Sequence, residues 1–226
     1  MNIKNNINYL RQNLPAGCTL VAVSKTQPIE IIQDAYSAGQ RVFGENKVQE
    51  LVPKYEALPK DISWHMIGHL QTNKVKYIAP FVECIQSVDS AKLLEEINKQ
   101  ARKNNRIIRC LLQMFIASEE TKFGFSEDEI VQLFESGAVE KLSNVAVVGL
   151  MGMATFTADE SQIRREFRKL KSFFEGLKKR SLPPNVHMDE LSIGMSGDYR
   201  IAVDEGSTIV RVGTAIFGER NLHKSS

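Results

Sequence analysis

The sequence predicts an α/β fold in which eight parallel strands close into a single barrel surrounded by helices. Strand-like apolar runs lie near residues 19–24, 40–43, 63–67, 82–88, 107–114, 145–150, 187–192 and 208–212. Segments with helical spacing alternate with these runs, and such alternation implies parallel strands joined by crossover helices. Eight units is the number that closes a TIM-type barrel, for which 226 residues is an ordinary length. An open, doubly wound sheet is the alternative arrangement.

The segments between the strand-like runs carry signals for helices. Residues 29–36 have a helical pattern that ends at Gly39, and residues 90–97 have another, for which Ser90 is a candidate N-cap. No Pro/Ser-rich linker or strong internal repeat divides the chain. We therefore expect one domain over residues 1–226.

A basic stretch over residues 164–180 raises the question of nucleic-acid binding. Apolar residues recur through it at helical spacing, which favours an outer helix of the barrel with a solvated basic face. These apolar residues are Ile163, Phe167, Leu170, Phe174 and Leu177. We expect no nucleic-acid partner.

Composition and charge are typical of a globular protein and indicate no particular partner. Hydrophobic residues make up 42% of the chain and charged residues 25%, with a net charge of +2. No apolar stretch approaches the roughly 20 residues of a membrane span, and the first residues lack the apolar part of a signal peptide. We therefore expect a cytoplasmic protein without a membrane partner, as a monomer or weak dimer.

The three cysteines favour reduced thiols. Cys18, Cys84 and Cys110 are odd in number and widely spaced, and two of them lie inside apolar runs. This pattern argues against disulfides and against a metal site. His65 and His69 have a spacing that suits a metal on a helix, but the run before Gly68 is strand-like, and four residues along a strand span about 13 Å. We expect no metal.

Lys25 is the candidate for the central functional residue. It follows an apolar run at the carboxyl end of the first predicted strand, where burying an ammonium is costly unless it is paired or deprotonated. Functional groups of such barrels lie at the carboxyl ends of the strands. The alternative is that Lys25 simply emerges into solvent where the strand stops.

The loops after the last two predicted strands are suited to holding a phosphate. The first reads Ile193-Gly194-Met195-Ser196-Gly197-Asp198, and we expect Ser196 to open the following helix. The second contains Gly213 and Thr214. Backbone N–H groups at helix starts bind phosphate, and barrels hold phosphate in these two loops, although either loop alone is compatible with ordinary turn chemistry. With Lys25, they suggest a phosphate-bearing aldehyde held as a Schiff base, and pyridoxal 5′-phosphate fits that description.

Five segments then carry a resemblance to a known family. They are Ala-Val-Ser-Lys-Thr at 22–26, Phe-Gly-Glu-Asn-Lys-Val-Gln-Glu at 43–50, Trp-His-Met-Ile-Gly-His-Leu-Gln-Thr-Asn-Lys at 64–74, Leu-Ser-Ile-Gly-Met-Ser at 191–196 and Val-Arg-Val-Gly-Thr-Ala-Ile-Phe-Gly at 210–218. In this order they resemble the pyridoxal phosphate homeostasis protein family, over nearly the whole chain. The resemblance implies a single barrel of the alanine racemase N-terminal domain type, with pyridoxal 5′-phosphate held covalently on Lys25.

The resemblance also implies roles for other residues. The phosphate contacts of the family map to Ser196, with Met195 beside it, and to the turn of Gly213 and Thr214. The arginine that faces the pyridine nitrogen maps to Arg211, and a residue lining the same pocket maps to Asn46.

At the end of the predicted fifth strand one position departs from the family pattern, and the segment after it resembles the family again. The family often reads Gln-Val-Asn where this chain has Gln113-Met114-Phe115, so the polar contact of that asparagine has no counterpart at Phe115. Lys122 lies in a segment that resembles the family's Lys-x-Gly loop. It is either a second amine near the entrance or an ordinary solvated loop lysine.

Arg211 narrows the chemistry that the resemblance implies. Arginine only donates hydrogen bonds, so Arg211 facing the ring nitrogen would hold that nitrogen unprotonated and weaken the ring as an electron sink. Transamination and decarboxylation are disfavoured. We expect a protein that stores, buffers or delivers pyridoxal phosphate, with PLP-dependent apo-enzymes as partners and without catalytic turnover. The alternative is an amino-acid racemase, but racemases of this type draw an opposing tyrosine from a second domain, and one barrel uses up this chain.

Overall fold

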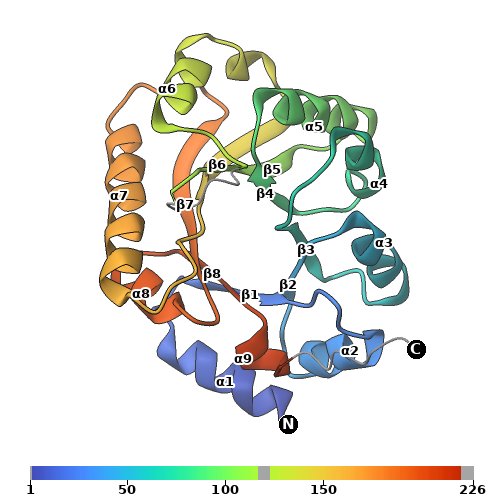
Figure 1. Ribbon diagram of the computed structural model, residues 1–226. Coiled ribbons are helices and arrows are strands. Elements are labelled where there is room, and N and C mark those ends of the chain that lie inside the picture. The colour runs from blue at the N-terminus through green and yellow to red at the C-terminus, as the bar shows by residue number, and fades with distance from the viewer. Residues whose placement is uncertain (1, 117–122, 220–226) are drawn as a thin grey trace, which may run out of the picture.

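The computed structural model describes residues 2–116 and 123–219, and its eight strands form the closed barrel that the sequence predicts (Figure 1). All neighbouring strands are parallel, and β8 returns to pair with β1, which excludes the open sheet. The strands are β1 (Thr19–Val23), β2 (Val42–Glu45), β3 (Ser63–Met66), β4 (Cys84–Val88), β5 (Ile108–Gln113), β6 (Val145–Met151), β7 (Val186–Met195) and β8 (Ile209–Val212).

Helices surround the barrel on its outside (Figure 1). They are α1 (Ile3–Asn13), α2 (Ile29–Ser37), α3 (Val48–Ala57), α4 (Val75–Ile78), α5 (Ala91–Lys103), α6 (Glu127–Glu135), α7 (Glu160–Lys178), α8 (Tyr199–Asp204) and α9 (Thr214–Phe217), with short 3-10 helices at Thr72–Lys74 and Val139–Lys141. The first helix, α1, precedes the barrel and is tied to α9, because Asn6 Nδ2 donates to the Ile216 carbonyl at 2.9 Å. Within the described residues, no helix combines the length and the apolar character that crossing a bilayer requires.

The predicted helix signals are confirmed. Gly39 follows α2 at φ 89°, in the left-handed region that favours glycine. The Ser90 side chain accepts the Leu93 amide at the start of α5. The basic stretch is the outer helix α7, whose five predicted apolar residues are all buried.

The second and seventh strands differ most from their predicted bounds. The second strand was expected near 40–43 and occupies Val42–Glu45. Gln40 lies in the preceding loop, where its side chain links α1 to β1. The Gln40 side chain accepts from Arg11 at 2.9 Å and donates to the Leu20 carbonyl at 2.7 Å. The seventh strand was expected over 187–192 and continues to Met195, with Gly194 in the left-handed region at φ 93°.

The core has two parts. A large cluster packs the outer face of the strands against the helices, and a smaller one joins buried residues of β1, β4, β5, β6 and β8. Side chains from strands all around the ring meet only inside the barrel, so the smaller cluster is its interior; it comprises Val21, Cys84, Leu111, Val148, Met151 and Ile209. All three cysteines are free thiols, as predicted, and burial raises the pKa of Cys84 to about 12.

Candidate functional site

Lys25 lies in a turn directly after β1, at the carboxyl end of the barrel, as predicted. Its side chain is half-buried, between Ser24, which is fully buried, and Thr26, which is exposed. Thr26 has φ 63°, an uncommon conformation for a residue with a branched side chain. A turn of this kind persists when its surroundings hold it in place.

A buried ion pair holds the residue before Lys25. The Ser24 hydroxyl donates to Glu45 Oε1 at 2.6 Å, and Lys54 Nζ donates to the Ser24 carbonyl at 2.8 Å. Lys54 Nζ also lies 2.7 Å from Glu45 Oε1, with 9% of the Lys54 side chain and none of the Glu45 side chain exposed. The end of β1 is thereby fixed to β2 and α3.

A second carboxylate holds the residue after Lys25. The Thr26 amide donates to Glu50 Oε2 at 2.7 Å, and the same oxygen lies 3.4 Å from Lys54 Nζ. Glu50 and Lys54 are one turn apart on α3, so one helix face supports the turn on both sides of Lys25.

Glu45 has a fully buried carboxyl group, which is unusual for a glutamate. Burial raises the pKa of its carboxyl, while the charge of Lys54 and the bonds from Lys54 and Ser24 oppose that rise. Its other oxygen, Oε2, is buried and has no hydrogen-bond partner among the residues that the structure describes. Glu45, Glu50 and Lys54 had no predicted role, and the one available signal was the i,i+4 spacing of Glu50 and Lys54.

The two loops predicted to hold phosphate come together. Met195 ends β7, Ser196 follows it, and Gly213 lies between β8 and α9. The Gly213 amide donates to Ser196 Oγ at 3.1 Å. A Cβ on Gly213 would lie 3.2 Å from the carbonyl oxygen of Val23, at the end of β1. The loops after β7, β8 and β1 therefore form one continuous site.

The helix after β7 does not begin as predicted. Ser196 was expected to open it, but α8 begins at Tyr199, with Asp198 before it. The Asp198 carboxylate instead accepts the Met195 amide at 2.5 Å, which closes a tight turn between β7 and α8. The Ser196 hydroxyl is engaged across the loops by Gly213. Thr214, the first residue of α9, is exposed, and the first amides of a helix have no partner within the helix.

Arg211 lies inside β8 and is 4% exposed. Its Nη1 donates to the Ser192 carbonyl at 2.8 Å and to Ser192 Oγ at 2.6 Å, and its Nη2 donates to the Gly152 carbonyl at 3.0 Å. Burial lowers the pKa of Arg211 to about 10, while the charge of Asp198 opposes that change. The guanidinium is therefore charged at neutral pH and held in a fixed orientation.

Asn46 follows β2 directly and is half-buried. A Cβ on Gly44 would contact Val21 of the interior cluster, so Gly44 faces into the barrel. Alternate residues of a strand share a face, which places Asn46 on the inward side at the mouth.

The remaining sequence candidates have other surroundings. His65 Nδ1 lies 2.8 Å from Gln86 Nε2, whereas His69 Nδ1 lies 2.9 Å from Asp89 Oδ2, so the two histidines bind different partners. Phe115 is half-buried after β5. Lys122 lies outside the described residues.

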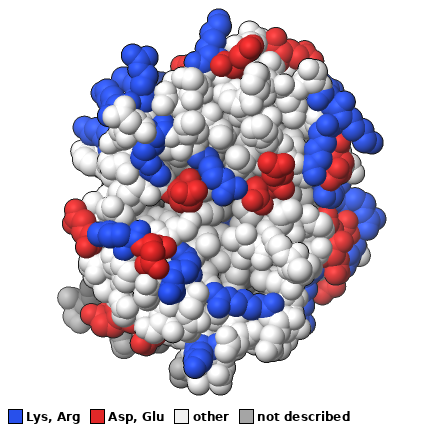
Figure 2. Space-filling view, turned by 180° about the vertical axis from the view of Figure 1, so that it is seen from behind, with Lys and Arg blue, Asp and Glu red and all other residues white. Residues whose placement is uncertain are grey.

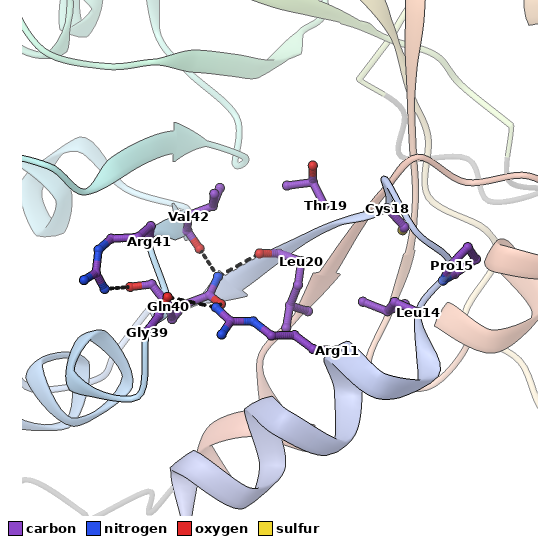
Figure 3. Close-up of a pocket in the computed structure, with 10 residues that line it drawn as sticks. All are labelled: Arg11, Leu14, Pro15, Cys18, Thr19, Leu20, Gly39, Gln40, Arg41 and Val42. Carbon is purple, nitrogen blue, oxygen red and sulfur yellow. Dashed lines mark hydrogen bonds between the residues drawn. The ribbon is translucent and has the colours of Figure 1, made fainter.

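A separate pocket of about 210 Å³ lies at the other end of β1 and β2 (Figure 3). It is lined by residues before and at the start of these strands, including Arg11, Cys18, Gln40 and Arg41. Arg11 and Gln40 bond to each other there and to nearby carbonyls. Their hydrogen-bonding groups hold the loops together, so this pocket is not part of the predicted site.

The fold and the site define a class of protein. A family profile described as "Alanine racemase, N-terminal domain" matches residues 1–221. An alanine racemase from Streptomyces lavendulae aligns with a TM-score of 0.78 over 97% of this chain and 57% of that chain. At 18% identity, this similarity shows the fold alone.

Nearer relatives define the family. The pyridoxal phosphate homeostasis protein of Aquifex aeolicus is 44% identical over 89% of this chain and 86% of that protein, and the human one is 40% identical over 91% and 78%. PipY of Synechococcus elongatus, solved with PLP bound, aligns with a TM-score of 0.87 at 35% identity, over 96% of this chain and all of that one. The chain belongs to the pyridoxal phosphate homeostasis protein family, as its five segments predicted.

Proposed function

We propose that this protein binds pyridoxal 5′-phosphate at the carboxyl end of the barrel and takes part in keeping the intracellular cofactor level, by storage, buffering or delivery to PLP-dependent apo-enzymes. Lys25 would hold the cofactor as a Schiff base. Ser196, Gly213 and Thr214 would hold its phosphate, with Met195 and Asn46 lining the pocket.

The observation that carries this proposal is the contact between the Gly213 amide and Ser196 Oγ at 3.1 Å. It joins two loops rich in small residues beside the end of β1, two residues before Lys25. A hydroxyl and nearby backbone amides suit a phosphate, and a lysine at the same mouth suits an aldehyde. The residues present therefore fit a phosphate-bearing aldehyde.

Arg211 supports the choice of ligand and limits its chemistry. When bound, pyridoxal phosphate supplies an aldehyde carbon and a ring that withdraws electrons. Arg211 remains protonated and can only donate to the ring nitrogen, so the ring withdraws electrons less strongly than one paired with a carboxylate. This favours holding the cofactor over decarboxylation or transamination. The relative from Aquifex aeolicus is named for pyridoxal phosphate homeostasis and PipY was solved with PLP bound, and both agree with this ligand.

The test is a visible spectrum of the purified protein incubated with pyridoxal phosphate, followed by borohydride reduction and peptide mass mapping. We expect a coloured protein and one reduced adduct on Lys25. A colourless protein with no modified lysine would refute the proposal.

Exchange of the substrate α-proton separates a carrier from an amino-acid racemase. A racemase must exchange the α-proton of its amino acid with solvent deuterium, because it removes and returns that proton. We expect no exchange above the rate of free pyridoxal phosphate for small amino acids such as alanine. Fast, saturable exchange that Lys25→Ala abolishes would establish the racemase instead.

A further inference from the structure

A chain of buried polar residues crosses the inside of the barrel below the site. It runs from His65 on β3 through Gln86 on β4 and Ser192 on β7 to Arg211 on β8. Gln86 and Ser192 are fully buried, and His65 and Arg211 are each 4% exposed. The interiors of such barrels are usually filled with branched aliphatic side chains, so four linked polar residues need a reason.

The hydrogen bonds that link these four residues all run in the same direction, with each donor on the Arg211 side of its acceptor. Arg211 Nη1 donates to Ser192 Oγ at 2.6 Å, and Ser192 Oγ donates to Gln86 Oε1 at 2.6 Å. Gln86 Nε2 lies 2.8 Å from His65 Nδ1, and an amide nitrogen only donates, so His65 Nδ1 accepts. Each dipole presents its negative end toward the guanidinium, which suits a buried cation.

His65 is held in the state that this direction requires. Burial, with a smaller contribution from the charge of Arg109, lowers its pKa to about 3, so the imidazole is neutral at physiological pH. With Nδ1 accepting, the proton of the neutral ring is on Nε2.

His65 also borders a hollow of about 400 Å³ at the amino-terminal ends of the strands. Arg109 and Glu190 pair there at 3.1 Å, and acidic and basic side chains surround a depression near the middle of the face seen in Figure 2. The polar chain thus runs from this hollow to the floor of the proposed cofactor site.

We propose that His65 is a positioning residue that acts through Gln86 and Ser192 to orient Arg211 toward the ring nitrogen of the cofactor. The inference rests on the proposed function. Both Nη1 hydrogens are committed to Ser192 and one Nη2 hydrogen to Gly152, so the Nε–H and the second Nη2–H are the donors left for a ligand.

The reason lies in what Gln86 does when its acceptor is lost. Without His65 Nδ1, the Gln86 amide would keep an unpaired buried N–H, which is costly. Rotation of the amide would relieve that cost by turning its N–H group toward Ser192. The Ser192 hydroxyl would then face an N–H donor in place of its acceptor, Gln86 Oε1, and would have to rotate, which disturbs the hydrogen bond that it accepts from Arg211 Nη1.

Matched substitutions at His65 test this. The Oδ1 of asparagine branches from the same Cγ as the Nδ1 of histidine, so His65→Asn keeps an acceptor where Gln86 needs one. His65→Leu keeps a similar volume without an acceptor. Ser192→Ala removes another of the four linked polar side chains. It replaces His65→Leu in the test if that variant does not fold, which thermal unfolding would show.

The readout is the ratio of dissociation constants for pyridoxal 5′-phosphate and its 1-deaza analogue, in which the ring nitrogen is replaced by C–H. We expect wild type and His65→Asn to prefer the natural cofactor equally. In His65→Leu and Ser192→Ala the preference should fall about three- to tenfold, the range of one hydrogen bond, with little change for the analogue.

Other results would overturn the inference in distinguishable ways. Equally weakened binding of both ligands would mean that His65 only supports the fold. An unchanged preference in His65→Leu and Ser192→Ala would mean that the four linked polar residues do not affect the contact with the ring nitrogen. A wild-type protein that binds neither compound would refute the proposed function itself, and this inference with it.

Discussion

Replacing Lys54 with methionine should destabilise the protein strongly and release the turn that carries Lys25. Methionine preserves the length and apolar stem of lysine but removes its charge and its three donors. Glu45 would then be a fully buried carboxylate without its ion-pair partner, and the Ser24 carbonyl would lose a bond of 2.8 Å.

The expected loss is large because the pair is buried. Removing one partner of a buried ion pair costs about 3–5 kcal/mol, against a total stability of about 5–15 kcal/mol for a typical domain. The double variant Glu45→Gln, Lys54→Met leaves no buried charge and should cost less than Lys54→Met alone. Lys99→Met is the control, because Lys99 is 63% exposed in its pair with Glu96 and its loss should cost about 0.2–0.5 kcal/mol.

The pH dependence of this loss has a definite sign. Burial already raises the pKa of Glu45, and loss of the opposing charge of Lys54 should raise it further. A carboxyl whose pKa is higher in the folded state binds protons more tightly there, so stability rises as the pH falls through that pKa. The deficit of Lys54→Met relative to wild type should therefore narrow from pH 7 down toward about 4.3, the usual pKa of glutamate.

Urea unfolding of the wild type and the three variants at pH 7 and pH 5 measures these differences. A Lys54→Met protein that loses no more free energy of unfolding than Lys99→Met would refute the importance of the buried pair. A deficit that grows on acidification would refute the assignment of the unpaired charge to Glu45.

Three further predictions concern the site and the thiols. Lys25→Ala should bind pyridoxal phosphate reversibly without a borohydride-trappable adduct and unfold at a near-normal midpoint, and a full adduct mapped to one other lysine would show that the wrong residue was named. Gly213→Val should weaken cofactor retention in equilibrium dialysis more than Thr214→Ala, because its Cβ would lie 3.2 Å from the Val23 carbonyl oxygen; wild-type retention in Gly213→Val would place the phosphate elsewhere. Cys84 and Cys110 should resist thiol reagents at pH 8 until the protein unfolds, since burial raises the pKa of both thiols, and rapid labelling of the native protein would contradict their burial.

The barrel was predictable because its strands are buried on both faces. Such strands appear in the sequence as continuous apolar runs, and eight of them alternate with helical patterns. The prediction of strand boundaries was wrong where a residue type typical of turns has another role inside a strand. Glycine is typical of turns, yet Gly194 lies within β7. A Cβ at this position would lie 2.5 Å from the Ala202 Cβ, so glycine is needed here for close packing against α8.

The supporting residues of the site were less predictable than Lys25 itself. Lys25, Ser196 and Gly213 lie just beyond the ends of predicted strands, where the barrel topology alone assigns them a common edge, whereas the role of Arg211 was predicted from the family resemblance. Glu45 and Lys54 are instead related by the packing of α3 against the turn after β1. Nothing in the local sequence states which oxygen a helix lysine will reach.

The closed strand order of the barrel provides one rule by which the buried partners of Arg211 could have been predicted from the sequence. In a barrel paired in chain order, β4 and β8 are four strands apart in either direction and face each other across the interior. Arg211 interrupts the apolar residues Val210 and Val212, and Gln86 is a polar residue in the strand opposite. A buried cation needs polar partners, and its own strand offers none on the inward face. A charged residue in an apolar barrel strand thus directs the search to inward polar residues on the adjacent strands and on the strands facing it. Here that search leads from Arg211 to Ser192 and Gln86, and from them to His65.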